Sequence, residues 1–181
     1  TGGFYVASLQ KQGELKRSVV VPIELSVSED ILDFTAHLQS RFDFKDAVLE
    51  QYHYFSPSRR GIYATHRSNR GLLSTEWGNV KFDSVGLFFM KTKIKFPKLT
   101  SSAIMLLGQY ARKHVVVLSR EQLDCYLKRQ DVVLQSEQRV DCVKSGYVVV
   151  IYDDICVGMG MMYVAEGQQQ QLMKSLFPGN L

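Results

Sequence analysis

Apolar residues recur at helical spacing after residue 26 of this 181-residue chain. Ser26 and Glu29 stand three residues apart, the spacing of a capping box at a helix N-terminus. The side chains that would line one face of this helix are Ile31, Phe34, Thr35, Leu38 and Phe42. The pattern therefore predicts an amphipathic helix of about four turns.

Short runs of β-forming residues follow the predicted helix. They lie around 51–55, 61–65 and 71–75, and arginine-rich segments with turn chemistry separate them. We expect three short strands here, which together with the helix would form a small α+β unit.

A second compositional unit begins near Gly78. Residues 85–96 read as one long strand or two joined strands, and Pro97 marks the end. A helix capped by residues 100–102 is predicted next, then a short strand at 115–118. The next helix is predicted to start at a second capping box, formed by Ser119 and Gln122.

The last third of the chain returns to strands. The pattern predicts strands at 131–134, 146–152 and 155–165, with a two-residue turn at Asp153-Asp154. Gly158-Met159-Gly160 interrupts the final strand, which is typical of a β-bulge or a close backbone approach. Few helices among many short strands, without βαβ alternation, favour an α+β fold with a curled sheet or pseudo-barrel.

Composition adds little about function. Hydrophobic residues make up 45% of the chain, enough for a core, and 22 basic against 18 acidic residues give a net charge of +4. Three cysteines, Cys125, Cys142 and Cys156, lack the paired spacing of a zinc site, so we interpret them as reduced, buried thiols. No apolar run approaches the roughly 20 residues of a membrane span, and we expect an intracellular protein.

Motifs of catalysis and cofactor binding are absent from the sequence. There is no P-loop, no dinucleotide-binding glycine motif, no His-Glu-x-x-His and no Gly-x-Ser-x-Gly. Neither Cys125 nor Cys156 has a neighbouring base that would activate a thiol. We therefore assign no catalytic, cofactor or metal residue to this chain.

Lysines alternate with other residues in the predicted strand before Pro97. Lys91, Lys93 and Lys95 would share one face, with neighbours roughly 6.6 Å apart, close to the phosphate spacing of an extended nucleic-acid strand. Lys98 follows, and Asp83 is the one acidic residue between 80 and 100. The pattern indicates phosphate contact, and an edge strand guarded by lysine against aggregation is the alternative.

A second basic cluster lies between the strand-like stretches of the first unit. Its members are Arg59, Arg60, Arg67 and Arg70. Aromatic residues are interleaved with them, and this mixture of cations and stackable rings suits RNA. A solvated hairpin surface is the alternative.

Several stretches resemble the Sun-type RNA cytosine-5 methyltransferases. Thr1–Lys11 is similar to the last strand of their methyltransferase domain. Three further segments, Val85–Lys95, Leu118–Leu127 and Gly146–Pro178, resemble the tail of the bacterial branch that modifies small-subunit ribosomal RNA. The chain departs from the family in its terminal loop, where Leu172–Pro178 has one extra residue and no Asn.

The resemblance implies three parts of a longer protein. Residues 1–22 would end the methyltransferase domain, 23–77 would form a small α+β linking domain, and 78–181 a PUA-like RNA-binding pseudo-barrel with short helices. The cysteine nucleophile and the S-adenosylmethionine pocket would lie upstream. We therefore expect no cofactor in this chain and an RNA-facing role for Lys91, Lys93, Lys95 and Lys174.

The expected function is to dock RNA for methylation by the upstream domain. Ribosomal RNA is the first expectation and transfer RNA the second, with no membrane or DNA partner. The compartment would be cytoplasmic in a bacterium, nucleolar or mitochondrial in a eukaryote. The alternatives are a non-catalytic ribosome-assembly or RNA-scaffold protein and a protein-interaction domain.

Overall fold

A computed structural model describes residues 29–58, 61–69, 86–92, 94, 97–164 and 171–179. The helices of the described residues are α1 (Glu29–Phe42), α2 (Asp46–Leu49), α4 (Ser101–Leu107) and α5 (Arg120–Leu127), with 3-10 turns η1 (Arg67–Asn69), η2 (Gly108–Tyr110) and η3 (Ser136–Gln138). The strands are β1 (Tyr52–Ser58), β2 (Gly61–His66), β3 (Leu87–Lys91), β4 (Lys98–Leu99), β5 (Val115–Val117), β6 (Val132–Leu134), β7 (Arg139–Val140), β8 (Gly146–Tyr152), β9 (Ile155–Met162) and β10 (Gln171–Ser175).

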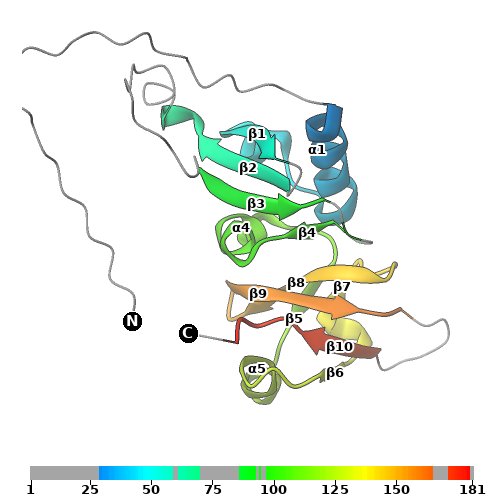
Figure 1. Cartoon of the computed structure of the whole chain (residues 1–181). Helices are drawn as coiled ribbons and strands as arrows, with labels where there is room; N and C mark the ends of the chain where they lie inside the picture. The colour runs from blue at the N-terminus through cyan, green and yellow to red at the C-terminus, as the bar shows by residue number, and fades with distance from the viewer. Residues whose placement is uncertain are drawn as a thin grey trace, which may run out of the picture.

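The first layer is an antiparallel sheet of order β1-β2-β3-β4, with α1 against it (Figure 1). The predicted helix is confirmed, because Ile31, Phe34, Leu38 and Phe42 are buried and Thr35 is half-buried. The ring of Phe34 packs edge-on against Tyr54 and Phe89, with centroids 5.0 and 5.7 Å away. These contacts fix α1 on the sheet through aromatic packing.

The second layer is a strongly curled sheet of order β6-β10-β9-β8-β5-β7, which forms a nearly closed barrel. β5 and β8 run parallel, and the other pairs of this sheet are antiparallel. α5 packs across its interior and buries Leu123 and Tyr126 there. The mixed α+β class with a barrel-like sheet is therefore confirmed.

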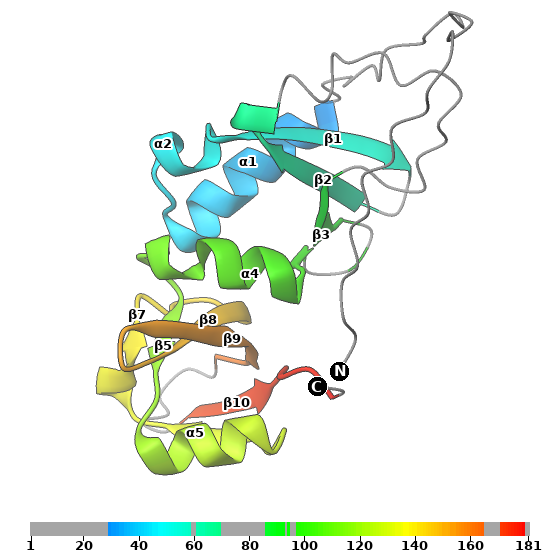
Figure 2. The same cartoon turned by 90° about the vertical axis from the view of Figure 1, so that its left-hand side faces the viewer.

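The strand β8 contributes side chains to the cores of both layers. Its alternating side chains face opposite sides, so Val148 and Val150 enter the barrel interior while Val149 faces α4 and the first layer. α4 lies between the two sheets and buries Ile104 and Leu107 (Figure 2). Both faces of β8 are thus covered, which accounts for its nearly continuous apolar sequence.

The predicted caps at residues 100 and 119 and the turn at residues 153–154 are confirmed, whereas Ser26 of the first predicted capping box lies outside the described residues. The Thr100 side chain accepts a hydrogen bond from the Ala103 amide at 3.2 Å, and Ser119 forms the predicted capping box with Gln122. Asp153 and Asp154 form the turn between β8 and β9 with φ of 49° and 60°. The register between these strands shifts near Gly158, as a bulge does.

Some predicted strands have different bounds in the structure. The strand expected over 85–96 stops at Lys91, because the chain turns back and Lys98–Leu99 pair with Met90–Lys91. β9 ends at Met162 instead of residue 165. The segment interpreted as a terminal loop contains β10, since it pairs with both β9 and β6.

The four-stranded sheet joins strands from either side of the predicted division at residues 77 and 78. β2 precedes that division and β3 follows it, yet they pair through Ile62 with Met90 and Ala64 with Leu87. The division itself, the segment 1–22 and the strand expected at 71–75 lie outside the described residues. The three-part organisation stays a prediction.

The three cysteines are free thiols. Cys156 is buried as expected, whereas Cys125 and Cys142 are only half-buried. Cys156 lies between β9 and α4, where its thiol donates a hydrogen bond to the carbonyl of Ile104 at 3.4 Å.

Candidate nucleic-acid interface

Lys91 and Lys98 lie directly opposite each other on β3 and β4. Opposed residues of an antiparallel pair point to the same face, with Cβ atoms roughly 4.5–5.5 Å apart, and like charges in this arrangement repel. Lys91 is exposed and Lys98 is half-buried. Burial and the charge of Lys91 both lower the pKa of the Lys98 ammonium. The pair is therefore an electrostatically unfavourable arrangement in the isolated chain.

An aromatic ring accompanies this pair. The Lys98 ammonium lies over the ring of Tyr147, 5.6 Å from its centroid, a cation–π contact. Tyr147 is at the start of β8 and half-buried. Among the described residues, Arg112 and Asp43 form an ion pair at 3.9 Å. No described carboxylate forms an ion pair with Lys91 or Lys98.

Arg41 fixes the position of Tyr147. The Nε and Nη2 atoms of Arg41 donate to the carbonyl oxygen of Tyr147 at 3.0 and 2.8 Å. Its guanidinium also donates to the carbonyls of Ser145, at 3.2 Å, and Lys144, at 3.4 Å. Because Arg41 belongs to the last turn of α1, it ties the first layer to the start of β8.

The sheet topology relates this lysine pair to part of the arginine cluster. Gly61, the first described residue after Arg59 and Arg60, has φ of 148° and lies against the Met90 carbonyl, next to Lys91. The two arginines thus precede a strand that begins at the same end of the sheet as the lysine pair. Arg59 and Arg60 themselves lie outside the described residues.

Arg67 lies at the opposite end of the sheet. It is exposed in η1, and its amide donates to the carbonyl of Gln51 at 2.8 Å. Tyr52 and Tyr54 line a hollow of about 250 Å³ with it, on the α1 side of the sheet. The tyrosine hydroxyls are neutral at neutral pH, as an ordinary tyrosine is, and burial raises the pKa of both further.

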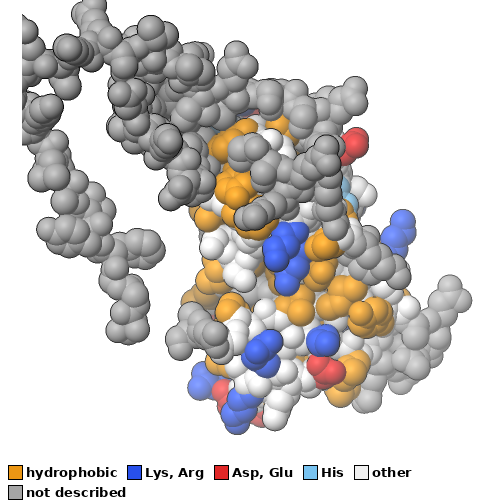
Figure 3. All heavy atoms as spheres, viewed as in Figure 1, with side chains coloured by type: hydrophobic (Ala, Val, Ile, Leu, Met, Phe, Trp, Pro, Cys, Tyr) orange, Lys and Arg blue, Asp and Glu red, His pale blue; other side chains and the backbone are white. Residues whose placement is uncertain are grey.

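Lys174 lies in the other sheet. It is exposed on β10, opposite Met161 of β9. On the face seen in Figure 3, described Lys and Arg side chains stand in separate groups with hydrophobic side chains between them. The structure thus brings Lys91 and Lys98 together and keeps Arg67 and Lys174 on separate elements.

Three further candidates, Lys93, Lys95 and Arg70, lie outside the described residues. Lys93 and Lys95 belong to the connection between β3 and β4, so the lysine pair stands at its two ends. Two residues of the interface were missed by sequence reasoning, Tyr147 and Arg41. Neither has a local signal, because their contact joins positions 106 residues apart.

Burial affects the reactivity of two of the three thiols. Burial raises the pKa of Cys142 to about 11 and also raises that of Cys156. A thiol attacks as its thiolate, so burial lowers the nucleophilicity of both groups at neutral pH. In the part of the chain that the structure describes, no three His, Cys, Asp or Glu side chains form a group that could hold a metal ion.

No protein-family model matches the chain, and no curated protein matches it either. None of the helices in the described ranges is long and apolar enough to cross a membrane.

Proposed function

We propose that this chain binds RNA by contacting the phosphates of the RNA backbone. The observation that carries the proposal is the Lys91–Lys98 pair, two like charges held opposite each other at the ends of a connection that contains Lys93 and Lys95. An anion between the two ammonium groups would convert their repulsion into attraction. Nucleic-acid phosphates supply such anions at regular intervals.

Tyr147 gives the lysine pair a second means of recognition. Arg41 holds the main chain at Tyr147, and the Lys98 ammonium lies over its half-buried side chain, so the ring is partly ordered before a base stacks nearby. Single-stranded RNA offers both unstacked bases and phosphates, which favours RNA over double-stranded DNA as the ligand.

The sequence resemblance extends this proposal to a parent protein. The chain would be the RNA-docking end of a Sun-type RNA cytosine-5 methyltransferase, in which the barrel-like sheet is a PUA-like domain. An upstream domain would supply the cysteine nucleophile and bind S-adenosylmethionine. Ribosomal RNA would be the first substrate class to test, followed by transfer RNA.

The test compares K91Q/K98Q with K45Q/K128Q, a control that removes the same charge from two exposed lysines on other elements. Fluorescence anisotropy with a labelled single-stranded RNA gives the affinity of each protein at several salt concentrations. The control should behave like the unmodified chain. K91Q/K98Q should bind more weakly, and its log–log salt slope should flatten by about 1.4, for two lost phosphate contacts on a single strand.

Stability separates this result from a folding defect. K91Q/K98Q removes the repulsion between the two lysines and the contact of Lys98 with Tyr147, two effects of opposite sign that are each about 1 kcal/mol or less, so its free energy of unfolding should stay within about 1 kcal/mol of the control. If RNA affinity and salt slope are unaltered in a folded K91Q/K98Q, the pair is not part of an RNA surface. Reduced solubility of the variant would then indicate a guarded edge at β4, the outer strand that carries Lys98, since β3 with Lys91 lies inside the sheet.

A further inference from the structure

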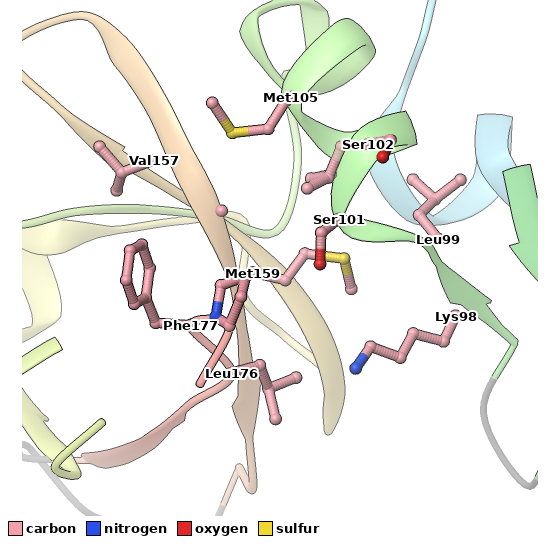
Figure 4. Close-up of a pocket in the computed structure, with 12 residues that line it drawn as sticks. Lys98, Leu99, Ser101, Ser102, Met105, Val157, Met159, Leu176 and Phe177 are labelled. Atoms are coloured by element: carbon pink, nitrogen blue, oxygen red, sulfur yellow. The ribbon is translucent and has the colours of Figure 1, made fainter. Parts of the chain in front are cut away.

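A cavity of about 280 Å³ opens between α4 and β9, where the two layers meet. Figure 4 shows Met105 of α4 and Phe177, after β10, projecting toward the same space. The walls of this α4–β9 cavity are formed by Lys98, Leu99, Ser101, Ser102, Ile104, Met105, Val157, Gly158, Met159, Leu176, Phe177 and Pro178.

The lining is almost wholly apolar. Its polar side chains are the two serines and Lys98, while aliphatic, thioether and aromatic groups form the rest. A nucleobase carries several donors and acceptors on its edge, and burying them without partners costs free energy. The wall therefore favours an apolar occupant over a base. The two thioethers, of Met105 and Met159, let such a wall adapt to the shape of its occupant.

The volume decides what kind of apolar occupant fits. Pockets that hold whole drug-sized molecules or cofactors measure about 300–1,000 Å³. At about 280 Å³ the α4–β9 cavity falls just below that range. A cavity of about 150 Å³ holds a benzene ring, so this space has room for a large side chain such as Leu, Met or Phe together with neighbouring atoms of the same segment.

A positive charge on one side of the cavity sets a second requirement for its ligand. Lys98 lines the cavity and extends from β4 toward Leu176 in Figure 4. The like charge of Lys91 lies opposite Lys98 on the neighbouring strand. No carboxylate of the described residues forms an ion pair with either lysine. An acidic residue next to an apolar side chain in the cavity would meet the Lys98 ammonium and offset the like charge of Lys91 beside it.

We propose that the α4–β9 cavity is a docking site for a segment of a partner protein, in which a large apolar residue is followed by an acidic one. The apolar side chain fills the cavity, and the carboxylate pairs with Lys98. Because Lys98 also belongs to the proposed RNA surface, the partner segment and RNA would compete for this lysine, whereas the apolar part of the cavity would serve the partner alone.

The test uses the chain labelled with carbon-13 at its methionine methyl groups. Of six methionines, Met105 and Met159 line the cavity, and the other four serve as internal controls. The probe is the acetylated, amidated dipeptide Leu-Glu, titrated while the methyl signals are recorded. We expect its addition to shift the Met105 and Met159 signals and to leave the other four nearly unchanged.

Two matched peptides test the two parts of the motif. Ala-Glu lacks the anchor and should bind about tenfold or more weakly, as an anchor residue that fills a pocket requires. Leu-Gln lacks the charge and should bind about threefold more weakly, the size of a partly exposed ion pair. Equal affinity for all three peptides would overturn the proposal.

A pair of variants tests the location. S101F places a ring in the cavity from an exposed position and should abolish the Leu-Glu shifts, whereas Q109F adds the same ring to an exposed position outside the lining and should not. A folded S101F that binds Leu-Glu normally would overturn the proposal. So would the absence of shifts at millimolar peptide, or uridine, which has no phosphate for Lys98, moving the Met105 and Met159 signals and displacing the peptide.

Discussion

Replacing Arg41 by methionine should loosen the junction between the two layers. Methionine keeps much of the apolar stem of arginine and removes the guanidinium that donates to the carbonyls of Lys144, Ser145 and Tyr147. The same change frees the start of β8, which carries the ring beside Lys98. Stability and RNA binding should therefore fall together.

The magnitude follows from the hydrogen bonds. Two of them reach the Tyr147 carbonyl at 2.8 and 3.0 Å, and a third reaches Ser145 at 3.2 Å. A hydrogen bond to a charged group contributes about 1.5–3 kcal/mol, and water will replace part of it because Arg41 is half-buried. We expect R41M to lose about 2–3 kcal/mol of unfolding free energy.

Urea unfolding followed by circular dichroism measures this loss at fixed pH. R41K is the matched variant, because it keeps the charge and loses the planar fork that reaches several carbonyls at once. It should lie between R41M and the unmodified chain. If R41M loses less than about 0.5 kcal/mol of unfolding free energy, as ordinary surface changes do, Arg41 does not hold the two layers together.

Three further changes probe single contacts. G61A should lose at least about 2 kcal/mol, because φ of 148° is unfavourable for alanine and its Cβ would meet the neighbouring strand; unchanged urea unfolding would contradict this. Y126F removes a buried hydrogen bond to the carbonyl of Met159, 2.9 Å long, and should cost about 1–2 kcal/mol in the same assay. Burial lowers the pKa of His114 below its ordinary value of 6.5. The neutral imidazole of His114 therefore contributes its full stabilisation above pH 6.5. This stabilisation is lost as the pH falls from 6.5 toward the pKa of His114 in the folded state. Unfolding free energy measured from pH 7.5 to 5.5 should fall by up to about 1.4 kcal/mol per pH unit for this group, and H114N should flatten the profile.

Predictions from sequence succeeded where the signal is local. The caps at Thr100 and Ser119 and the turn at Asp153-Asp154 each depend on residues within one turn of chain, so composition reveals them. The helix α1 was equally accessible, because one apolar stripe decides which face is buried.

Long-range pairing could not be predicted in the same way. The alternation around Lys91 continues past the point where β3 ends, and only its pairing with β4 reveals the turn. β10 escaped prediction because its strand character comes from lying between β6 and β9. The α4–β9 cavity combines three distant segments around Lys98, Val157 and Leu176, and no local pattern connects them.

The most direct test of the RNA-binding proposal is the salt dependence of RNA affinity in the unmodified chain. Four phosphate contacts, one for each of Lys91, Lys93, Lys95 and Lys98, give a single-strand slope of about −2.8. Raising salt from about 50 to 200 mM should then weaken binding about 50-fold. Affinity that stays constant over this range, or no RNA binding at the lower salt, would contradict the account.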